Sequence, residues 1–274
     1  MAFETKPLSQ KNIQRKNMPY SFEIKKSFTI VSFILSTWAV IAFFLSQTAI
    51  SQETADIYEN LALVKVEKEM GEISVFEKQL IREGLIDVGL LDPTIMVDLK
   101  YAREDNFMGV NVYGDFTCAY LQSEAAWKLV RASEILRERY PHLRILVGDA
   151  LRPRSVQYMM WKLVENTPMQ PYVANPESGS MHNFGAAVDV TLFNVKTGKK
   201  LDMGTPFDYF GPLAQPRLEA RFLQEGKLSK DQIENRLILR NAMVDAGWYP
   251  INIEWWHFNA FPRDYIRRNY SIIE

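Results

Sequence analysis

The sequence of 274 residues contains only one cysteine and three histidines, and its net charge is close to zero. Each of these features excludes certain kinds of site or binding partner. The single cysteine, Cys118, excludes an intramolecular disulfide and any zinc site built from several cysteines. Its thiol is either a nucleophile or a small buried apolar group, and the context "FTCAYL" favours burial. A formal charge of -1 leaves no basic excess to attract phosphates, so no nucleic-acid partner is expected.

Charge is also missing from one stretch near the N-terminus, Phe28 to Leu45, which follows a polar segment that leans basic. Its 18 residues approach the length of about 20 that a transmembrane helix needs. Ala49 and Ser51 are placed like a signal-peptidase site. We therefore predict a cytoplasmic segment at 1–27 and either a signal peptide or a membrane anchor at 28–50. Basic residues ahead of the apolar run indicate export, to the periplasm or the outer side of the bacterial cytoplasmic membrane.

The remaining chain divides at about residue 90. Residues 51–90 are mixed and charged, which predicts a linker with an N-terminal helix over 56–70, and residues 91–274 are expected to form one domain. Apolar spacing and capping signals predict helices over 124–140, 155–166 and 230–247. Short β-branched or aromatic runs predict strands over 144–150, 186–193 and 251–258. Helices that pack on such a small sheet indicate an α+β fold.

The stretch "SGSMHNFGAAVDVTL" places His182 seven residues before Asp189. Asp189 interrupts an apolar run that predicts a buried strand, and a buried carboxylate without a partner is costly. A metal ion is one possible partner. His257 ends "EWWH", three residues after Glu254, and on a regular strand these two side chains would face opposite sides. The strand must therefore end or bulge between them if both are to reach one site.

Two histidines and one carboxylate suit a catalytic zinc ion that keeps water in its fourth position. Glu254 is then a candidate to accept the proton of that water, and Arg152, in "GDALRPRS", to neutralise an oxyanion. The same motifs also fit a loop histidine and an aromatic core strand without any metal. Spacing alone does not connect His182 with His257.

The motifs together resemble a known family. "SGSMHNFGAAVDVTL" is similar to the Ser-x-His-x-x-Gly-x-Ala-x-Asp signature of zinc D-alanyl-D-alanine peptidases, and "EWWHF" is similar to their Glu-x-x-His element. "DLKYAREDNFMG", "VYG", "DALRP" and "FDYFG" resemble most the D-alanyl-D-alanine dipeptidases of the vancomycin-resistance (VanX-like) group. The resemblance runs from about Asp92 to Phe261 and implies a small α+β domain with a central antiparallel sheet and flanking helices.

The resemblance also implies roles for individual residues. It implies one zinc ion per chain with three ligands: His182, Asp189 and His257. Glu254 resembles the general base of the family, and Arg152 resembles the arginine that stabilises the tetrahedral intermediate. Two further residues are similar to those that hold the substrate's free amine: Asp208, in "TPFDYFG", and Ser180.

Three functions remain open at this point. The favoured one is zinc-dependent hydrolysis of the dipeptide D-Ala-D-Ala in the turnover or recycling of cell-wall precursors. The alternatives are a D,D- or L,D-carboxypeptidase that trims peptidoglycan peptides, and a non-catalytic wall-binding module. Asp208 favours the dipeptidase, because a carboxylate that receives a free amine is of no use to a longer peptide. Leu151 departs from the aromatic residue often found at its position, and the segment Gly211 to Lys230 has no assigned role.

Overall fold

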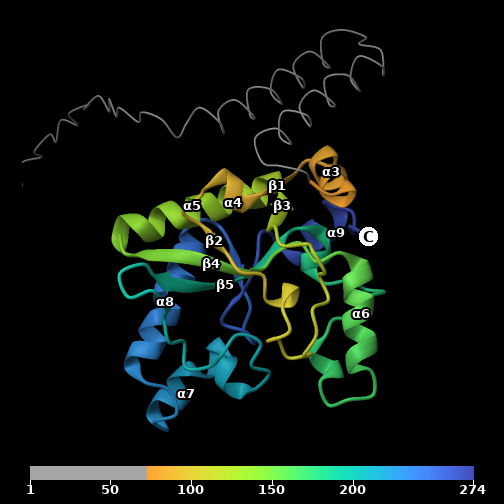
Figure 1. The fold of residues 1–274 in the computed structure, drawn as a ribbon. Helices are drawn as coiled ribbons and strands as arrows, with labels where there is room; N and C mark the ends of the chain where they lie inside the picture. Colours follow the sequence, from red (N-terminus) through yellow and green to blue (C-terminus); the bar gives the residue numbers. More distant parts are fainter. Residues whose placement is uncertain (1–72) are drawn as a thin grey trace, which may run out of the picture. The chain divides into compact units, whose positions relative to one another are not determined.

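The computed structural model of the chain describes residues 73–274 (Figure 1). Three predicted features fall outside these residues and stay predictions: the cytoplasmic segment 1–27, the signal peptide or membrane anchor 28–50, and the helix over 56–70. Within residues 73–274, no helix combines the length and the apolar character that crossing a membrane requires.

A six-stranded mixed sheet forms the centre of the described fold (Figure 1). Its strands lie in the order β2 (Met96–Val97), β4 (Leu143–Asp149), β5 (Ala187–Asn194), β8 (His257–Asn259) and β7 (Tyr249–Pro250), while β6 (Lys199–Lys200) pairs with β5. β2 runs parallel to β4, and the other pairs of this sheet are antiparallel. The α+β class is confirmed, but the expected antiparallel sheet is corrected to a mixed one. A long connection that contains a helix separates β2 from β4, and such a connection permits parallel pairing.

Helices flank the sheet, as predicted. Their bounds are α3 (Val75–Arg82), α4 (Val88–Leu91), α5 (Ser123–Arg139), α6 (Arg154–Val164), α7 (Glu219–Gln224), α8 (Lys230–Asp245) and α9 (Arg263–Asn269). Short 3-10 helices are η1 (Lys100–Ala102), η2 (Gln170–Tyr172), η3 (Met181–Phe184), η4 (Pro212–Ala214) and η5 (Pro216–Leu218). α5, α6 and α8 confirm the three helices predicted within the domain, to within two residues at each end.

The main apolar core lies between the sheet and α5, which packs along β4 and beside α8. Leu129 and Leu136 on the inner side of α5 are buried, as the apolar spacing predicted. Val188 and Val190 of β5 belong to the same core. Because side chains alternate along a strand, Asp189 must face the opposite side of the sheet. The core therefore fixes which face of the sheet carries the candidate ligands.

Two of the predicted strands are confirmed and one is wrong. β4 and β5 match the predictions over 144–150 and 186–193. Of the third predicted strand, 251–258, only the last two residues are regular, and they belong to β8 (His257–Asn259). Trp255 and Trp256 are adjacent and both buried, which a strand with one buried face does not allow. Trp255 Nε1 donates a hydrogen bond to Thr205 Oγ1 at 2.8 Å. The strand therefore begins only at His257, and Glu254 lies in the irregular segment before it, as a shared site requires.

A smaller sheet extends the fold toward the N-terminus. β1 (Leu85–Asp87) pairs with β3 (Tyr120–Gln122), and the two strands run antiparallel to each other. Leu80 of α3 and Leu85 of β1 form a second apolar cluster with Tyr120, Leu151 and Ile273. In Figure 1, α3 lies close to the C-terminal end of the chain. Part of the predicted linker segment 51–90 therefore packs against the domain predicted from residue 91.

Cys118 lies in the segment before β3 and is half-buried. Burial and the negative charge of Asp87 raise the pKa of its thiol to about 12. A thiol that stays protonated is a poor nucleophile, so the structural interpretation of this cysteine is favoured over the catalytic one.

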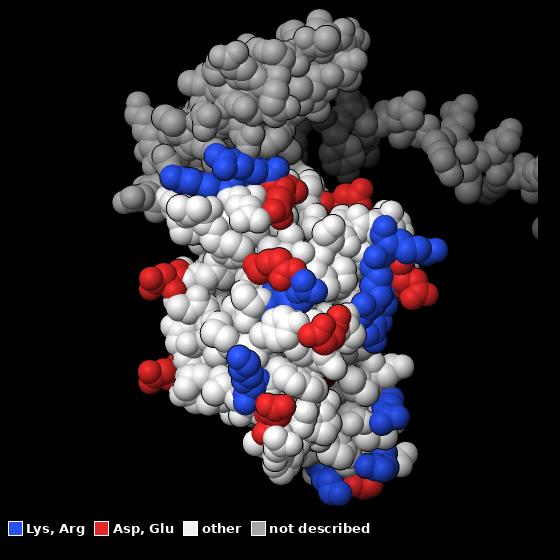
Figure 2. Space-filling view, turned by 90° about the vertical axis from the view of Figure 1, so that its right-hand side faces the viewer, with Lys and Arg blue, Asp and Glu red and all other residues white. Residues whose placement is uncertain are grey.

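The face of the molecule that includes α6 is shown in Figure 2. Charged side chains of both signs lie there in small groups, separated by wide areas of uncharged surface. Within the described residues visible on this face, basic side chains are interspersed with acidic ones.

Candidate active site

Three side chains of the site stand in one row across the sheet. Asp189 on β5 is paired in register with Asp149 on β4 and with His257 on β8. Directly opposed residues in antiparallel strands have Cα atoms about 4.5–5.5 Å apart, and their side chains share a face. The register thus brings His257 to Asp189, although 68 residues separate them in the chain.

His182 joins the row from the turn η3, immediately before β5. Ser180 caps this turn, and its Oγ accepts a hydrogen bond from the His182 backbone N–H at 3.4 Å. Gly185 ends the turn with a φ of +62°, a conformation that side chains other than hydrogen disfavour. A Cβ at this position would lie 3.1 Å from Leu85 and 3.4 Å from the backbone nitrogen of Gln122. The glycine therefore allows the turn to pass close to the smaller sheet while it presents His182.

The three predicted ligands converge as a metal site requires. His182 Nε2 lies 3.2 Å from His257 Nδ1 and 3.3 Å from Asp189 Oδ1. His257 Nδ1 lies 2.9 Å from Asp189 Oδ1. Tetrahedral ligands about 2.0–2.1 Å from a zinc ion are separated from one another by roughly 3.3–3.4 Å. The observed triangle is close to that size, so one ion fits these three atoms with little movement.

The outer ring nitrogens of both histidines have hydrogen-bond acceptors. His182 Nδ1 lies 2.7 Å from the carbonyl oxygen of Ala150, and His257 Nε2 lies 3.0 Å from Oδ1 of Asn259. Each acceptor places a proton on the outer nitrogen and leaves the lone pair of the inner nitrogen free for a metal. Asn259 was not predicted from the sequence, because its role depends on the position of His257 two residues earlier.

The electrostatics of the cluster favour a positive charge at its centre. Burial raises the pKa of Asp189, but the two histidines outweigh this effect and hold that pKa well below its usual range. Burial lowers the pKa of His257, yet its hydrogen bond to Asp189 and the carboxylate's charge raise it to about 9. A divalent cation bound by the same atoms supplies that positive charge in place of a proton.

Arg152 lies in the turn between β4 and α6, with its guanidinium buried. Its Nε donates to Asp149 Oδ2 at 3.1 Å, and its Nη1 donates to Gln157 Oε1 at 3.1 Å. The guanidinium carbon lies 4.9 Å from the centre of the Tyr101 ring. Burial lowers the pKa of Arg152, but the charge of Asp149 raises it well above its ordinary value, so the side chain stays charged.

Asp149, which the sequence analysis missed, connects this arginine to the metal ligands. Its fully buried carboxylate also accepts a hydrogen bond from the Tyr113 hydroxyl and lies 3.4 Å from His182 Nδ1. The signal that singled out Asp189, a carboxylate in an apolar strand, is also present in "RILVGDA". Asp149 could therefore have been found by the same reasoning.

Glu254 lies in the irregular segment before β8 and is half-buried. Burial raises the pKa of its carboxyl group, although the neighbouring histidines oppose the shift. A carboxyl group with a raised pKa exchanges protons near neutral pH more readily than an exposed one. The tryptophan that follows it, Trp255, is anchored to Thr205, which fixes the segment next to His257.

Asp208 presents an unpaired carboxylate oxygen inside the protein. Its Oδ1 accepts a hydrogen bond from the Tyr101 hydroxyl at 3.1 Å, whereas its buried Oδ2 has no hydrogen-bond partner among residues 73–274. Burial and the charge of Asp189 raise the pKa of Asp208 to about 8. The residue also has a φ of +58°, in the left-handed region that aspartate tolerates better than most residues. A buried polar atom without a partner is costly, and pairing with a cationic group would offset this cost.

Comparison with known proteins decides the family. Residues 82–273 match the peptidase family M15, described as D-ala-D-ala dipeptidase. The chain belongs to this family. It is 32% identical over 174 residues to a D-alanyl-D-alanine dipeptidase of Escherichia coli (strain K12), covering 64% of this chain and 83% of that relative. It is 29% identical over 188 residues to one of Enterococcus faecium, covering 61% and 89%, respectively.

The resemblance predicted from the motifs is thus confirmed at the level of the family. The matched range includes every residue predicted for the site and begins before the first quoted motif. The described residues also bring the three predicted ligands together, and this group can hold a metal ion. The roles of the individual residues, and zinc as the ion, stay proposals.

The segment 211–230, which had no assigned role, is held by the same side chain as the loop that carries Asp208. The segment contains η4, η5 and α7. Arg236, buried in α8, donates to the carbonyl oxygens of Met203 at 2.7 Å and Leu213 at 3.0 Å. The same guanidinium pairs with Glu219 of α7 at 3.3 Å. The two ends of the loop 203–213 are therefore held by one side chain.

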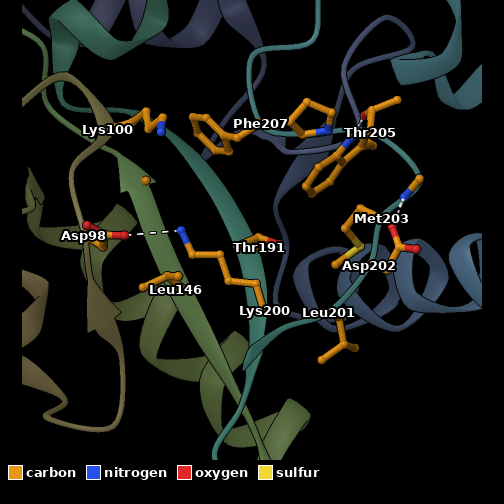
Figure 3. Close-up of a pocket in the computed structure, with 14 residues that line it drawn as sticks. Asp98, Lys100, Leu146, Thr191, Lys200, Leu201, Asp202, Met203, Thr205 and Phe207 are labelled. Carbon is orange, nitrogen blue, oxygen red and sulfur yellow. Dashed lines mark hydrogen bonds and ion pairs between the residues drawn. The ribbon is translucent and has the colours of Figure 1, made fainter. Parts of the chain in front are cut away.

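A cavity of about 450 Å³ opens on the sheet face beside this loop (Figure 3). Leu146 and Thr191 are among the residues that line it, together with Phe207, whose ring lies against the bare backbone of Gly148. Lys200, at its edge, is paired with Asp98 at 3.2 Å. None of the predicted site residues lines this cavity. It neighbours the candidate active site without being part of it.

Proposed function

We propose that this chain is a zinc-dependent dipeptidase that hydrolyses free D-Ala-D-Ala in the turnover or recycling of cell-wall precursors. The observation that carries the proposal is the unpaired buried oxygen of Asp208, next to three convergent metal ligands in a member of the D-ala-D-ala dipeptidase family. This acceptor matches the ammonium group that a dipeptide, unlike a longer peptide, carries one residue from the scissile bond.

His182, Asp189 and His257 would hold the zinc ion, with their inner nitrogens and one carboxylate oxygen as donors. The ion would polarise the scissile carbonyl and lower the pKa of the attacking water. Ala150 and Asn259 keep the two imidazoles in the required tautomers and orientations.

Glu254 acts as the general base in this proposal. Its carboxylate takes a proton from the attacking water and then gives a proton to the leaving amine as the peptide bond breaks. Burial raises the pKa of its carboxyl group, which favours the protonated form that it takes up between the two steps.

Arg152 stabilises the negative charge that develops on the carbonyl oxygen. Its guanidinium is fixed by Asp149 and Gln157 before substrate arrives, so little reorganisation is needed during the reaction. The arginine and the metal ion would thus act on the same developing charge.

Asp208 binds the substrate's ammonium group, and Ser180 adds a hydrogen bond at the same end. Pairing with a cation offsets the desolvation cost that raises the pKa of Asp208. An amide nitrogen at that position, as in a longer peptide, is neutral and leaves the buried carboxylate unpaired. This difference favours a dipeptidase over a carboxypeptidase.

The proposal is tested by comparing D-Ala-D-Ala with N-acetyl-D-Ala-D-Ala as substrates. The wild-type protein should prefer the free dipeptide, and sites built around a polar group reject analogues that lack it by up to about 10⁴–10⁵-fold. Asp208→Asn should reduce kcat/KM for the free dipeptide far more than for the acetylated one, with zinc content unchanged.

Asp115→Asn, a change at an exposed aspartate, is the matched control and should keep the wild-type preference. A wild-type preference for the acetylated or longer peptide would instead establish the carboxypeptidase. Zinc binding without hydrolysis of either peptide would favour the wall-binding module.

We also propose that the domain works outside the cytoplasm, on the support of the uncharged run over 28–45. Fractionated cells should contain the protein on the outer side of the cytoplasmic membrane. The N-terminal sequence of the mature protein then separates a cleaved signal peptide from a retained anchor. Full-length protein found only in the soluble cytoplasm would contradict both.

A further inference from the structure

Three aromatic rings from separate parts of the chain meet next to Asp208. The rings of Tyr172 and Phe210 are stacked, with centroids 4.8 Å apart and planes inclined by 22°. Phe107 meets Phe210 edge to face, with centroids 4.9 Å apart. We call Phe107, Phe210 and Tyr172 the aromatic bridge. It joins the segment after η1, the loop 203–213 and the turn η2.

The bridge begins at the group proposed to receive the substrate's amine. The Tyr101 ring lies edge to face against Phe107, with centroids 6.2 Å apart, and its hydroxyl donates to Asp208. Phe210 follows Asp208 by two residues on the same loop. The bridge therefore extends directly outward from the Tyr101–Asp208 pair.

The outer end of the bridge reaches the surface. Tyr172 is 49% exposed, whereas Phe107 and Phe210 are half-buried. Arg236 holds the two ends of the loop 203–213, and between them the ring contacts of Phe210 join the loop to the segments that carry Phe107 and Tyr172. Such stacked and edge-to-face pairs are the favoured arrangements of aromatic rings.

We propose that the aromatic bridge is the wall that restricts this site to dipeptides. An acyl group or further residue attached to the substrate's amine must extend from the nitrogen that faces Asp208, past Tyr101, into the space that Phe107 and Phe210 occupy. Steric exclusion by the bridge thus acts in addition to the charge preference of Asp208. The inference rests on the proposed function and assigns its length limit to named residues.

The test measures the ratio of kcat/KM for N-acetyl-D-Ala-D-Ala to that for D-Ala-D-Ala. Phe210→Ala removes both ring contacts of the loop tip, and Tyr172→Ala removes the exposed end of the stack without opening the core. Each variant should raise the ratio about tenfold or more, since one extra or missing methylene in an apolar pocket already discriminates by about 10–200-fold. Phe210→Leu, which keeps much of the volume, should raise it less than Phe210→Ala.

Tyr209→Ala is the matched control, because Tyr209 is an exposed aromatic residue in the same loop. It should leave the ratio at the wild-type value, and an equal rise in this variant would assign the effect to a loosened loop and overturn the bridge. An unchanged ratio in both Phe210→Ala and Tyr172→Ala would also overturn it. Failure of the wild type to cleave D-Ala-D-Ala would instead overturn the proposed function, and the inference with it.

Discussion

Replacement of Glu254 by glutamine is expected to remove most of the turnover while the metal stays bound. Glutamine has nearly the same shape but cannot accept and return a proton. General acid–base groups typically contribute about 10²–10⁴-fold, and the loss here should reach the upper part of that range because one group serves two proton transfers. kcat with D-Ala-D-Ala and the zinc content of the same preparation are the two measurements.

The ligand triangle of His182, Asp189 and His257 is complete without Glu254, which is why the metal should remain. The exposed Glu104 offers a matched control, since Glu104→Gln makes the same chemical change away from the site. Glu104→Gln should have wild-type kcat. Loss of zinc from Glu254→Gln would mean that Glu254 is a ligand, and the proposed proton transfer would then be wrong.

Replacement of His182 or His257 by alanine is expected to abolish metal binding and activity together. Each change removes one corner of the triangle and leaves two protein ligands, too few for a stable catalytic zinc site. Wild-type protein should hold about one zinc ion per chain, whereas both variants should hold almost none after dialysis. Removal of the metal from the wild type by a chelator should also abolish activity, and added zinc should restore it.

The third histidine provides the control for this experiment. His142 lies before β4, outside the group of candidate metal ligands found among the described residues. His142→Ala should keep both zinc and activity. Melting temperatures add a second readout, because a metal that binds only the folded state stabilises it. Added zinc should raise the melting temperature of the wild type and of His142→Ala, but not that of His182→Ala. Full zinc occupancy in both ligand variants would disprove the assignment.

Sequence reasoning was most successful where the signal is local. The helix α5 follows from apolar residues at helical spacing, since burial of one side of a helix requires that period. His182 and Asp189 share one short stretch, and a carboxylate inside an apolar strand already requires a partner. The need for a break between Glu254 and His257 also followed from strand geometry alone, and the irregular segment before β8 confirms it.

Sequence reasoning failed where distant segments decide the outcome. The parallel pairing of β2 with β4 depends on how the chain returns to the sheet, and no local pattern records that path. The final strand was predicted too long because its aromatic residues favour strands. In the structure both adjacent tryptophans, Trp255 and Trp256, are buried, and Trp255 donates a hydrogen bond to Thr205. Tertiary packing outweighed local propensity there.

For the candidate site, too, some properties follow from the sequence and others only from the tertiary structure. The sequence by itself determined which groups are available, because residue type sets the donor chemistry of the histidines, the carboxylates and the arginine. Only the tertiary structure decided how they act. Strand register places Asp189 between Asp149 and His257, and burial leaves one oxygen of Asp208 without a partner. The physical reason is that register and desolvation arise from contacts between residues far apart in the chain, which no short stretch of sequence contains.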